Sequence, residues 1–287
     1  MAVHRIFRSQ ELQDEFDKNG FVRLPLLTDE QVDALQRSYD TLAAAHERIG
    51  LPFTTTSHSN DHELIRQADQ YIADVMAPEM DRVLCDYQRL FGNFLIKQTG
   101  SESATPLHQD TTFVDEDRYR SISAWVSLVD TDRTNGCMRF VRGSHLFTRF
   151  LRPTHGYAWP YEPVRAELEA MLEDYPSRRG EAFIFDHAVI HASHPNLSGQ
   201  PRVAAVMAAY PQEADLLMYY AQSDPEQLGR YIMSREAYLR FVKGEAPQAT
   251  LAGIVPADHS PVTAAALRRM TVKPMSLLDR LRAALHS

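Results

Sequence analysis

The sequence contains only two cysteines, Cys85 and Cys137, and no apolar run long enough to cross a bilayer. So few cysteines exclude the disulfide framework of a small secreted protein. Without a run of about 20 apolar residues we expect no membrane-spanning helix, and the start of the chain has no apolar stretch typical of a secretory signal. Together these absences predict a cytoplasmic protein without a membrane partner.

Basic residues are also in the minority. The 30 lysines and arginines against 38 aspartates and glutamates give a formal net charge of −8. An acidic total argues against a general nucleic-acid-binding protein and leaves a small molecule as the expected partner. With 44% hydrophobic and 24% charged residues, the composition is that of a folded globular protein and excludes bulk disorder.

The first 90 residues have a mainly helical pattern. The spacing of apolar residues predicts helices over 7–18, 28–46 and 63–90, the last with a break near Pro78, and a short strand over 20–27. Thr28 and Gln31 have the spacing of a capping box, which marks the start of the second helix. The polar, turn-rich segment 49–62 is predicted to be a loop.

From residue 91 to residue 211 the apolar runs become short and rich in β-branched and aromatic residues. Predicted strands lie at 93–99, 107–114, 121–129, 137–143, 181–186 and 202–211. Asn135-Gly136 between two of them is typical of a hairpin turn. Residues 144–178 interrupt the strands as an insertion, and a helical pattern returns over 212–287. This order predicts one domain over 1–287, mainly β with flanking helices, built as a sandwich or barrel.

The segment His108-Gln109-Asp110 is the first sign of chemistry. Side chains two apart on a strand point to the same face, so an imidazole and a carboxylate would converge there. A second imidazole from a distant strand would complete the two-histidine, one-carboxylate triad of non-haem Fe(II) oxygenases. Alone, the motif is weak, because two polar residues on the rim of a strand would give the same pattern.

The segment 190–196, Ile-His-Ala-Ser-His-Pro-Asn, strengthens this interpretation, because Arg202 follows His191 by eleven residues. A hairpin would bring that arginine back beside the metal, where its planar fork could grip the far carboxylate of a dicarboxylate. With His108-Gln109-Asp110 and the Pro-Arg-Val-Ala of 201–204, this segment resembles the phytanoyl-CoA dioxygenase family of Fe(II)/2-oxoglutarate oxygenases. The resemblance covers about residues 18–211.

The resemblance implies a double-stranded β-helix, or jelly-roll, core with the metal at its open end. It implies that His108, Asp110 and His191 ligate Fe(II) and that Arg202 binds the distal carboxylate of the cosubstrate 2-oxoglutarate. By position in the family, Ser193, Trp125 and Lys97 are further candidates for contact with 2-oxoglutarate. Trp125 could equally be a core residue, and Lys97 a solvated strand residue.

Three histidines lie close together in the second motif. His194 precedes a proline, which favours an extended loop, and its spacing to Arg202 is eight residues instead of eleven. His191 is therefore the predicted ligand. His187 and His194 remain candidates for supporting contacts, for substrate contacts, or for polar residues on the rim.

The family chemistry implies that 2-oxoglutarate and O₂ are converted to succinate and CO₂ while an unactivated carbon of a small or mid-sized metabolite is hydroxylated. Related halogenases lack the carboxylate at the position of Asp110, so its presence favours hydroxylation. Desaturation, epoxidation, cyclisation and demethylation stay open, because the same oxidant starts them all. A cupin-like metal enzyme without 2-oxoglutarate and a non-catalytic ligand-binding jelly roll are the alternatives outside this class.

Two segments lie outside the motifs. Residues 150–163 are predicted to form a lid over the iron, with Tyr157 or Trp159 facing the substrate. Aromatic residues with one arginine, Arg152, suit a small or mid-sized organic acid, an amino acid or a natural-product scaffold. The alternative is that they pack the insertion onto the core. The segment after Pro274 reads as a basic amphipathic helix that packs on its own domain or touches a membrane or a second subunit. Monomer and homodimer are both compatible with the sequence.

Overall fold

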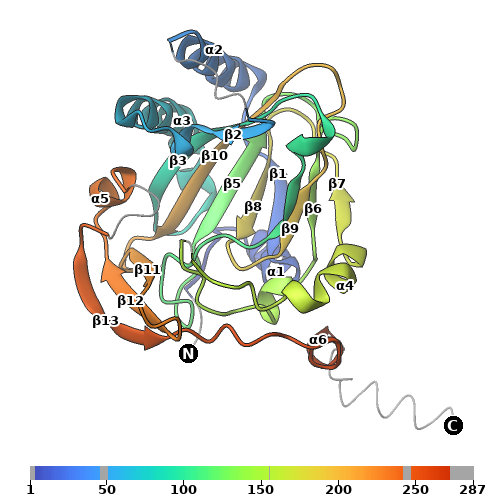
Figure 1. Cartoon of the computed structure of the whole chain (residues 1–287). Coiled ribbons are helices and arrows are strands. Elements are labelled where there is room, and N and C mark those ends of the chain that lie inside the picture. The colour runs from blue at the N-terminus through green and yellow to red at the C-terminus, as the bar shows by residue number, and fades with distance from the viewer. Residues whose placement is uncertain (1–3, 46–50, 155, 242–246, 272–287) are drawn as a thin grey trace, which may run out of the picture.

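The computed structural model describes residues 4–45, 51–154, 156–241 and 247–271 (Figure 1). Two antiparallel β-sheets form its centre. The larger has six strands, in the order β1 (Phe21–Pro25), β8 (Glu181–Asp186), β5 (Ile122–Ser127), β10 (Arg202–Pro211), β3 (Tyr87–Lys97) and β2 (Phe53–Thr55). The smaller has four, in the order β4 (Thr105–His108), β9 (His191–Ser193), β6 (Met138–Phe140) and β7 (Glu173–Tyr175). The predicted β core with jelly-roll architecture is confirmed.

An aromatic cluster joins the two sheets. Phe21 of the larger sheet stacks on Phe140 of the smaller one with 4.3 Å between ring centroids, and Phe183 packs beside them at 5.6 Å from Phe140. Aromatic rings bury large areas and hold specific relative orientations. This cluster therefore fixes how the smaller sheet lies on the larger one, and with it the position of β9 and β4.

The outer face of the larger sheet is covered by α2 (Asp29–Ala45) and α3 (His62–Val83), with α1 (Gln10–Asn19) beside β1 (Figure 1). The central strand β10 is buried on both faces. Val203, Ala205 and Met207 belong to the core under the helices, whereas Ala204 and Val206 belong to the core between the sheets. The alternation follows from the two-residue period of a strand.

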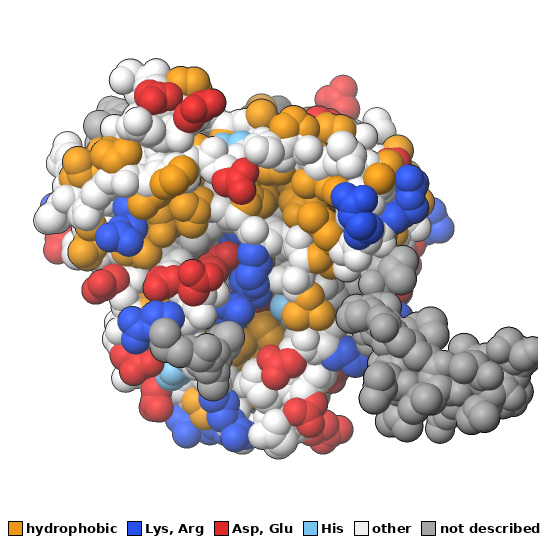
Figure 2. Space-filling model, turned by 90° about the horizontal axis from the view of Figure 1, so that it is seen from below, with side chains coloured by type: hydrophobic (Ala, Val, Ile, Leu, Met, Phe, Trp, Pro, Cys, Tyr) orange, Lys and Arg blue, Asp and Glu red, His pale blue; other side chains and the backbone are white. Residues whose placement is uncertain are grey.

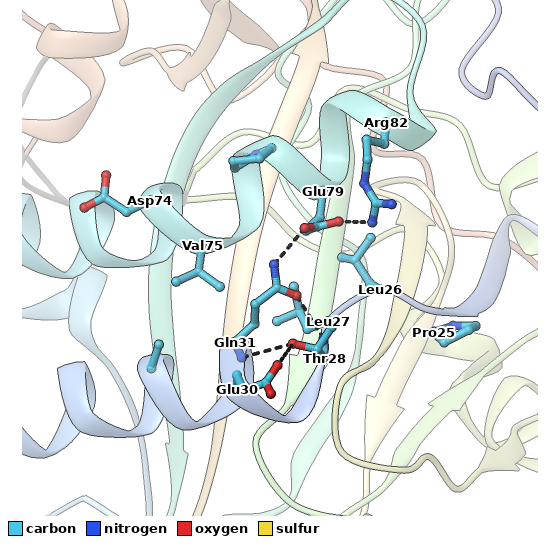
Figure 3. Close-up of a pocket in the computed structure, with 12 residues that line it drawn as sticks. Pro25, Leu26, Leu27, Thr28, Glu30, Gln31, Asp74, Val75, Glu79 and Arg82 are labelled. Atoms are coloured by element: carbon cyan, nitrogen blue, oxygen red, sulfur yellow. Dashed lines mark hydrogen bonds and ion pairs between the residues drawn. The ribbon is translucent and has the colours of Figure 1, made fainter.

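The predicted capping box at the start of α2 is confirmed. Gln31 donates its backbone N–H to the Thr28 hydroxyl, and its side-chain oxygen accepts from the Thr28 backbone N–H (Figure 3). Gln31 also donates to Glu79 of α3 at 2.7 Å, so the same residue ties the two helices together. The surface depression between these helices is lined by polar groups that pair with one another, and it is not part of the metal site.

The predicted break at Pro78 is wrong, because α3 runs through it from His62 to Val83. The buried face of α3, which includes Ile72, Met76 and Met80, packs on the larger sheet and keeps the helix together across the proline. Tertiary packing contributes more to the stability of a helix than intrinsic propensity does.

The predicted helical C-terminal part is wrong in most of its described length. Residues 212–271 contain a three-stranded antiparallel sheet with two short helices. In chain order these are β11 (Leu217–Ala221), β12 (Gln227–Ile232), α5 (Arg235–Leu239), β13 (Thr250–Pro256) and α6 (Ala264–Thr271). The apolar and aromatic run of β11 gives a strand because consecutive residues pack on both of its sides. The helix predicted after Pro274 lies outside the described residues.

Two further features of the chain bear on the predictions. Gly136 has a positive φ of 93°, as a turn requires, but β5 and β6 belong to different sheets, so the predicted hairpin at 135–136 is a crossing between sheets. The insertion 144–178 contains the short helix α4 (Arg165–Ala170) and β7.

Neither the described helices nor the surface seen in Figure 2 indicates a particular class of binding partner. Among the described residues, no helix combines the length and the apolar character that crossing a membrane requires. The face seen from below mixes acidic, basic and hydrophobic side chains, and neither sign of charge covers it (Figure 2).

Candidate metal and cosubstrate site

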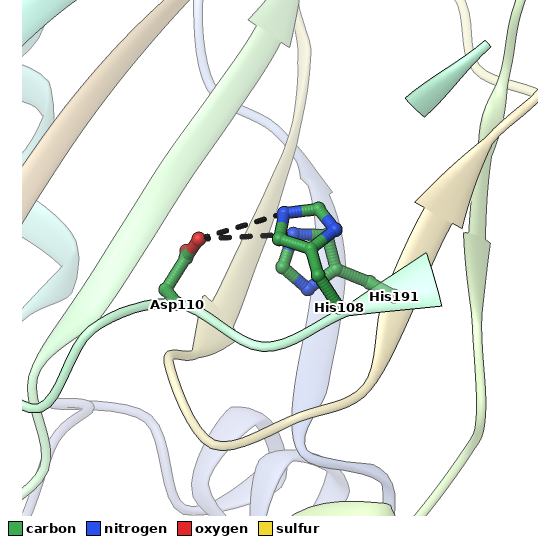
Figure 4. Close-up of side chains that lie close together, drawn as sticks. All are labelled: His108, Asp110 and His191. Carbon is green, nitrogen blue, oxygen red and sulfur yellow. Dashed lines mark ion pairs between the residues drawn. The ribbon is translucent and has the colours of Figure 1, made fainter. Parts of the chain in front are cut away.

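Three side chains that could bind a metal lie close together: His108, Asp110 and His191. The first and the last of them are 83 positions apart in the sequence (191 − 108). His108 ends β4, His191 begins β9, and these two residues are directly paired between the strands. One ligand atom from each of the three side chains lies within 4.8 Å of the others. The Asp110 carboxylate faces the two imidazole rings (Figure 4). Two histidines and one carboxylate suit a metal ion with further positions open.

The backbone orients both imidazoles. The Nδ1 atom of His108 lies 2.8 Å from the carbonyl oxygen of Pro106, and that of His191 lies 3.1 Å from the carbonyl oxygen of Val189. Since a carbonyl only accepts, each Nδ1 carries the proton and each Nε2 keeps its lone pair. These Nε2 atoms lie 3.8 and 4.0 Å from the Asp110 carboxylate. Burial, with the neighbouring His108, lowers the pKa of His191 to about 4, so this ring is neutral and able to bind a metal.

Asp110 lies two residues beyond the end of β4, so the alternation of a strand does not place it. Its backbone N–H donates to the carbonyl of His187 at 3.0 Å, and its carbonyl accepts from Nε of Arg152 at 2.6 Å. Burial would raise the pKa of Asp110, but the electrostatic effect of the neighbouring imidazoles and of the Arg152 guanidinium keeps it below its ordinary value. The carboxylate is therefore ionised and fixed in place.

Arg152 has a different role from the one predicted. Its side chain is fully buried, pairs with Glu116 and holds the backbone of Asp110, so it cannot bind an organic acid as part of a lid. The sequence separates Arg152 from Glu116 by 36 residues, and neither lies in a motif, so no sequence signal identifies the pair.

Arg152→Met should lower the free energy of unfolding by about 3 kcal/mol, because it leaves the Glu116 carboxylate buried without its partner. We take the lower end of the usual range because Arg149 lies 3.5 Å from the same carboxylate. Urea unfolding measures this loss, and the affinity for Fe(II) should fall with it. The double variant Arg152→Met/Glu116→Gln should recover stability but not iron affinity. Recovery of both would show that Arg152 does not position Asp110.

The other two histidines of the second motif are already engaged. Both ring nitrogens of His187 lie within hydrogen-bond distance of hydroxyls, Ser121 at 2.8 Å and Ser123 at 2.9 Å. His194 directs its Nε2 to Asp174 at 2.7 Å. The geometry therefore favours His191 as the ligand and gives His187 a supporting place behind Asp110.

Two buried cations lie in the same cavity, and no carboxylate neutralises either of them in the described part of the chain. The guanidinium of Arg202 lies over the ring of Trp125 at 5.3 Å and donates one hydrogen bond to the carbonyl of Gly136 at 3.1 Å, while its Nε and Nη1 have no partner. Lys97 donates to the carbonyl of Ser103. Burial lowers the pKa of Arg202 to about 10 and, with the charge of Arg202, that of Lys97 to about 7. Unpaired buried donors of this kind fit a bound dianion.

All seven predicted site residues line one cavity of about 800 Å³. They come from five strands and the loop after β4: His108, Asp110, His191, Ser193, Trp125, Lys97 and Arg202. The predicted lid segment also reaches this cavity through Pro153, Thr154 and Tyr157. Trp159 does not line it, and donates instead to the Gln109 side chain at 3.1 Å. No motif in the sequence marks several other lining residues, including Asn93, Phe91, Phe113 and Tyr238.

The chain is similar in sequence to curated proteins that are named after phytanoyl-CoA dioxygenase. It is 28% identical over 116 residues to phytanoyl-CoA dioxygenase domain-containing protein 1 of Danio rerio, a match covering 38% of this chain and 40% of the relative. It is 28% identical over 114 residues to phytanoyl-CoA dioxygenase 1 of Oryza sativa subsp. japonica, covering 39% and 40%. The matches thus span about 40% of the length of these curated relatives.

Solved structures share the fold. The carbocyclase SnoK from nogalamycin biosynthesis, described as non-haem and α-ketoglutarate-dependent, superposes with a TM-score of 0.54 at 20% identity, covering 72% of this chain and 86% of SnoK. The epimerase SnoN, in complex with Fe³⁺, α-ketoglutarate and nogalamycin RO, gives 0.54 at 18% identity, covering 90% and 96%.

The sequence profile of the phytanoyl-CoA dioxygenase (PhyH) family matches residues 16–204, which include the triad and Arg202. This is about two thirds of the chain and confirms the resemblance found in the motifs. The chain belongs to the phytanoyl-CoA dioxygenase (PhyH) family, a family of non-haem iron, 2-oxoglutarate-dependent enzymes.

Proposed function

We propose that this protein is an Fe(II)/2-oxoglutarate-dependent dioxygenase that hydroxylates an unactivated carbon of a small or mid-sized organic metabolite, with succinate and CO₂ as coproducts. The observation that supports it most is a single cavity that combines an open-sided His-Asp-His triad with two buried cations lacking a carboxylate partner. The triad suits a divalent iron, and the two buried basic side chains suit the distal carboxylate of 2-oxoglutarate.

In this proposal His108, Asp110 and His191 hold the iron, which supplies the activation of O₂ when it is bound. The neutral His191 imidazole and the ionised Asp110 carboxylate are already in the protonation states that metal binding requires. Asp110 occupies the third protein position, which favours hydroxylation over halogenation. The loop carrying it is held by Arg152 and the His187 carbonyl, so little ordering is needed when the metal binds.

The cosubstrate would lie between the triad and Arg202. The two unpartnered guanidinium nitrogens of Arg202 would donate to its distal carboxylate, with Trp125 packed against the far face of the guanidinium. Lys97 and the Ser193 hydroxyl line the same part of the cavity and would add donors. Each charged hydrogen bond of this kind contributes about 1.5–3 kcal/mol.

The alternatives fit the site less well. A cupin-like metal enzyme without 2-oxoglutarate would leave Arg202 and Lys97 as buried cations with no use, and a non-catalytic jelly roll would have no need for a complete triad. Other outcomes of the same chemistry, such as desaturation, epoxidation, cyclisation or demethylation, would need no different metal site. SnoK and SnoN, a carbocyclase and an epimerase, show that this fold accommodates different reactions.

The proposed function is tested by incubating the iron-loaded protein with 2-oxoglutarate and air, and screening candidate metabolites for substrate-dependent succinate release. A hydroxylase gives a product heavier by one oxygen atom, in a one-to-one ratio to succinate. A product with two hydrogens fewer and no added oxygen would replace hydroxylation by desaturation. Release of an oxidised product without consumption of 2-oxoglutarate would favour the cupin-like alternative.

Tyr157→Ala should weaken substrate binding and raise the consumption of 2-oxoglutarate that is not coupled to product. Tyr157 lines the cavity from the predicted lid segment and packs against Phe150 and His259, so its removal opens the cavity to water. The ratio of succinate to product measures the effect. Arg152 is kept in this variant, so iron binding should be unchanged. A ratio equal to that of the wild type would mean that the segment only packs the insertion onto the core.

A further inference from the structure

Part of the cavity wall comes from outside the family-matched region. The family profile ends at residue 204. The cavity is also lined by Tyr238 and Leu239 of α5 and by Phe241, which follows that helix. In Figure 1 α5 lies beside β3 and α3, and contacts among these elements confirm it. The C-terminal segment therefore belongs to the same chamber as the triad.

Tyr238 joins an aromatic wall that leads to the metal site. Its ring stacks on Phe91 with 5.5 Å between centroids and an interplanar angle of 17°, and meets Phe113 edge-on at 5.5 Å. Phe113 in turn meets His187 edge-on at 5.3 Å. Such a wall offers an apolar surface to a ring-shaped molecule.

The Tyr238 hydroxyl has no hydrogen-bond partner among the described residues. Burial, with the negative charge of Asp110, raises its pKa, so the phenol keeps its proton and remains a donor. Tyr238 is half-buried, and tyrosine hydroxyls inside proteins usually find a hydrogen-bond partner. A ligand in the cavity would supply that partner.

A buried carboxylate fixes the position of α5. Asp69 of α3 pairs with Arg235 in the first turn of α5 and accepts the backbone N–H of Gly92 at 2.8 Å, next to Phe91 in β3. The same side chain therefore holds both elements that carry the stacked rings. The Ser234 hydroxyl caps α5 by accepting from Ala237 N–H at 3.1 Å. These contacts place Tyr238 over the cavity.

Other lining residues are polar but uncharged. Asn93 donates to the hydroxyls of Thr55 at 2.6 Å and Ser57 at 3.2 Å, and its buried side-chain oxygen has no partner. Among the described lining residues the only lysine, arginine, aspartate or glutamate side chains are Lys97, Arg202 and Asp110, which the cosubstrate and iron would occupy. Besides the histidines His62 and His187, the remaining described wall offers aromatic faces, hydroxyls and amides, and no lysine, arginine or carboxylate.

We infer that Tyr238 is a substrate-binding residue and that the substrate is an uncharged, ring-containing molecule bearing hydroxyl groups. The ring packs on the wall of Phe91, Phe113 and Tyr238, and the Tyr238 hydroxyl donates to an oxygen of the substrate. This inference rests on the proposed function, because it takes the cavity as the place where the oxidised molecule binds.

The test uses full-length protein with Fe(II) and 2-oxoglutarate under anaerobic conditions. The probes are phenyl glucoside and phenyl glucuronide, which share a ring and hydroxyls but differ by a carboxylate, and binding is measured by calorimetry. The glucoside should bind at least tenfold more tightly than the glucuronide. Tyr238→Phe should weaken glucoside binding about three- to tenfold, as expected for one neutral hydrogen bond. The control Tyr231→Phe, in the same hydrophobic cluster but not lining the cavity, should bind it like the wild type.

Arg235→Met provides a second variant in which Tyr238 itself is intact. It should weaken glucoside binding, while the affinity for 2-oxoglutarate, measured in parallel, stays that of the wild type. Tighter binding of the glucuronide, or equal glucoside binding by Tyr238→Phe and the wild type, would overturn the inference. Glucoside binding that depends on Tyr238 without any oxygenated product in air would support the inference and count against the proposed function instead.

Discussion

Arg202→Met should make the protein more stable and the enzyme inactive. The guanidinium is 2% exposed, two of its three nitrogens have no partner, and no described carboxylate neutralises it. Replacing a buried charged group by an apolar side chain of similar length removes its desolvation penalty, which we expect to raise the free energy of unfolding by about 1–4 kcal/mol. Urea unfolding without ligands measures it. The exposed control Arg240→Met should change stability by less than about 0.5 kcal/mol.

The same variant should lose affinity for 2-oxoglutarate. Loss of a charged hydrogen bond costs about 1.5–3 kcal/mol, or roughly a 10- to 150-fold weaker affinity. In the wild type, saturating 2-oxoglutarate should raise the melting temperature, because it binds only the folded state; this shift should disappear in Arg202→Met. A less stable variant that still responds to 2-oxoglutarate would show that Arg202 is a structural residue.

His191→Ala should abolish turnover and iron binding, whereas His194→Ala should keep both. The two histidines are three residues apart, but only His191 directs its Nε2 toward Asp110, and His194 pairs with Asp174. Loss of one of three protein ligands leaves too few donors to hold the metal. His108→Ala should behave like His191→Ala. Iron content after dialysis and succinate release measure the two effects.

The two variants test the choice of His191, which the sequence spacing and the geometry both favour. An inactive His194→Ala protein beside an active His191→Ala protein would mean that the triad described here is not the metal site. Since His194 is mostly buried against Asp174, its replacement should cost some stability. The assay temperature must therefore lie below the unfolding transition of the least stable variant.

The β core and the candidate metal site could be predicted because short local sequence patterns identify their strands and their functional residues. The strands around the triad are short, apolar and bounded by turns, and His191 and Arg202 have the spacing expected from the motif. The hairpin predicted between them is wrong, because β9 and β10 belong to different sheets, and the chain crosses from one sheet to the other. Geometry then brings Lys97 and Trp125 beside them, since β3 and β5 are the neighbours of β10. Neighbouring strands of one sheet place residues of distant sequence on one face.

The residues that hold and extend the site could not be predicted. The buried pair of Arg152 and Glu116, and the contact of Asp69 with Arg235, join segments that no local pattern relates. The C-terminal strands were predicted to be helices for another reason. Their apolar residues fit either a helix or a strand, and only pairing between β11, β12 and β13 decides. For the same reason Tyr238 could not be assigned to the cavity from its sequence.

The most direct test of the account is an anaerobic titration of the protein with Fe(II) and 2-oxoglutarate, followed by visible absorption. Bidentate binding of a 2-oxo acid to Fe(II) gives a charge-transfer band that neither component gives alone. We expect the band to appear with one iron per chain, to be absent in His191→Ala, and to require roughly 10- to 150-fold more 2-oxoglutarate in Arg202→Met. No band in the wild type, or a band equally strong in His191→Ala, would contradict the assignment of this cavity as an iron and 2-oxoglutarate site.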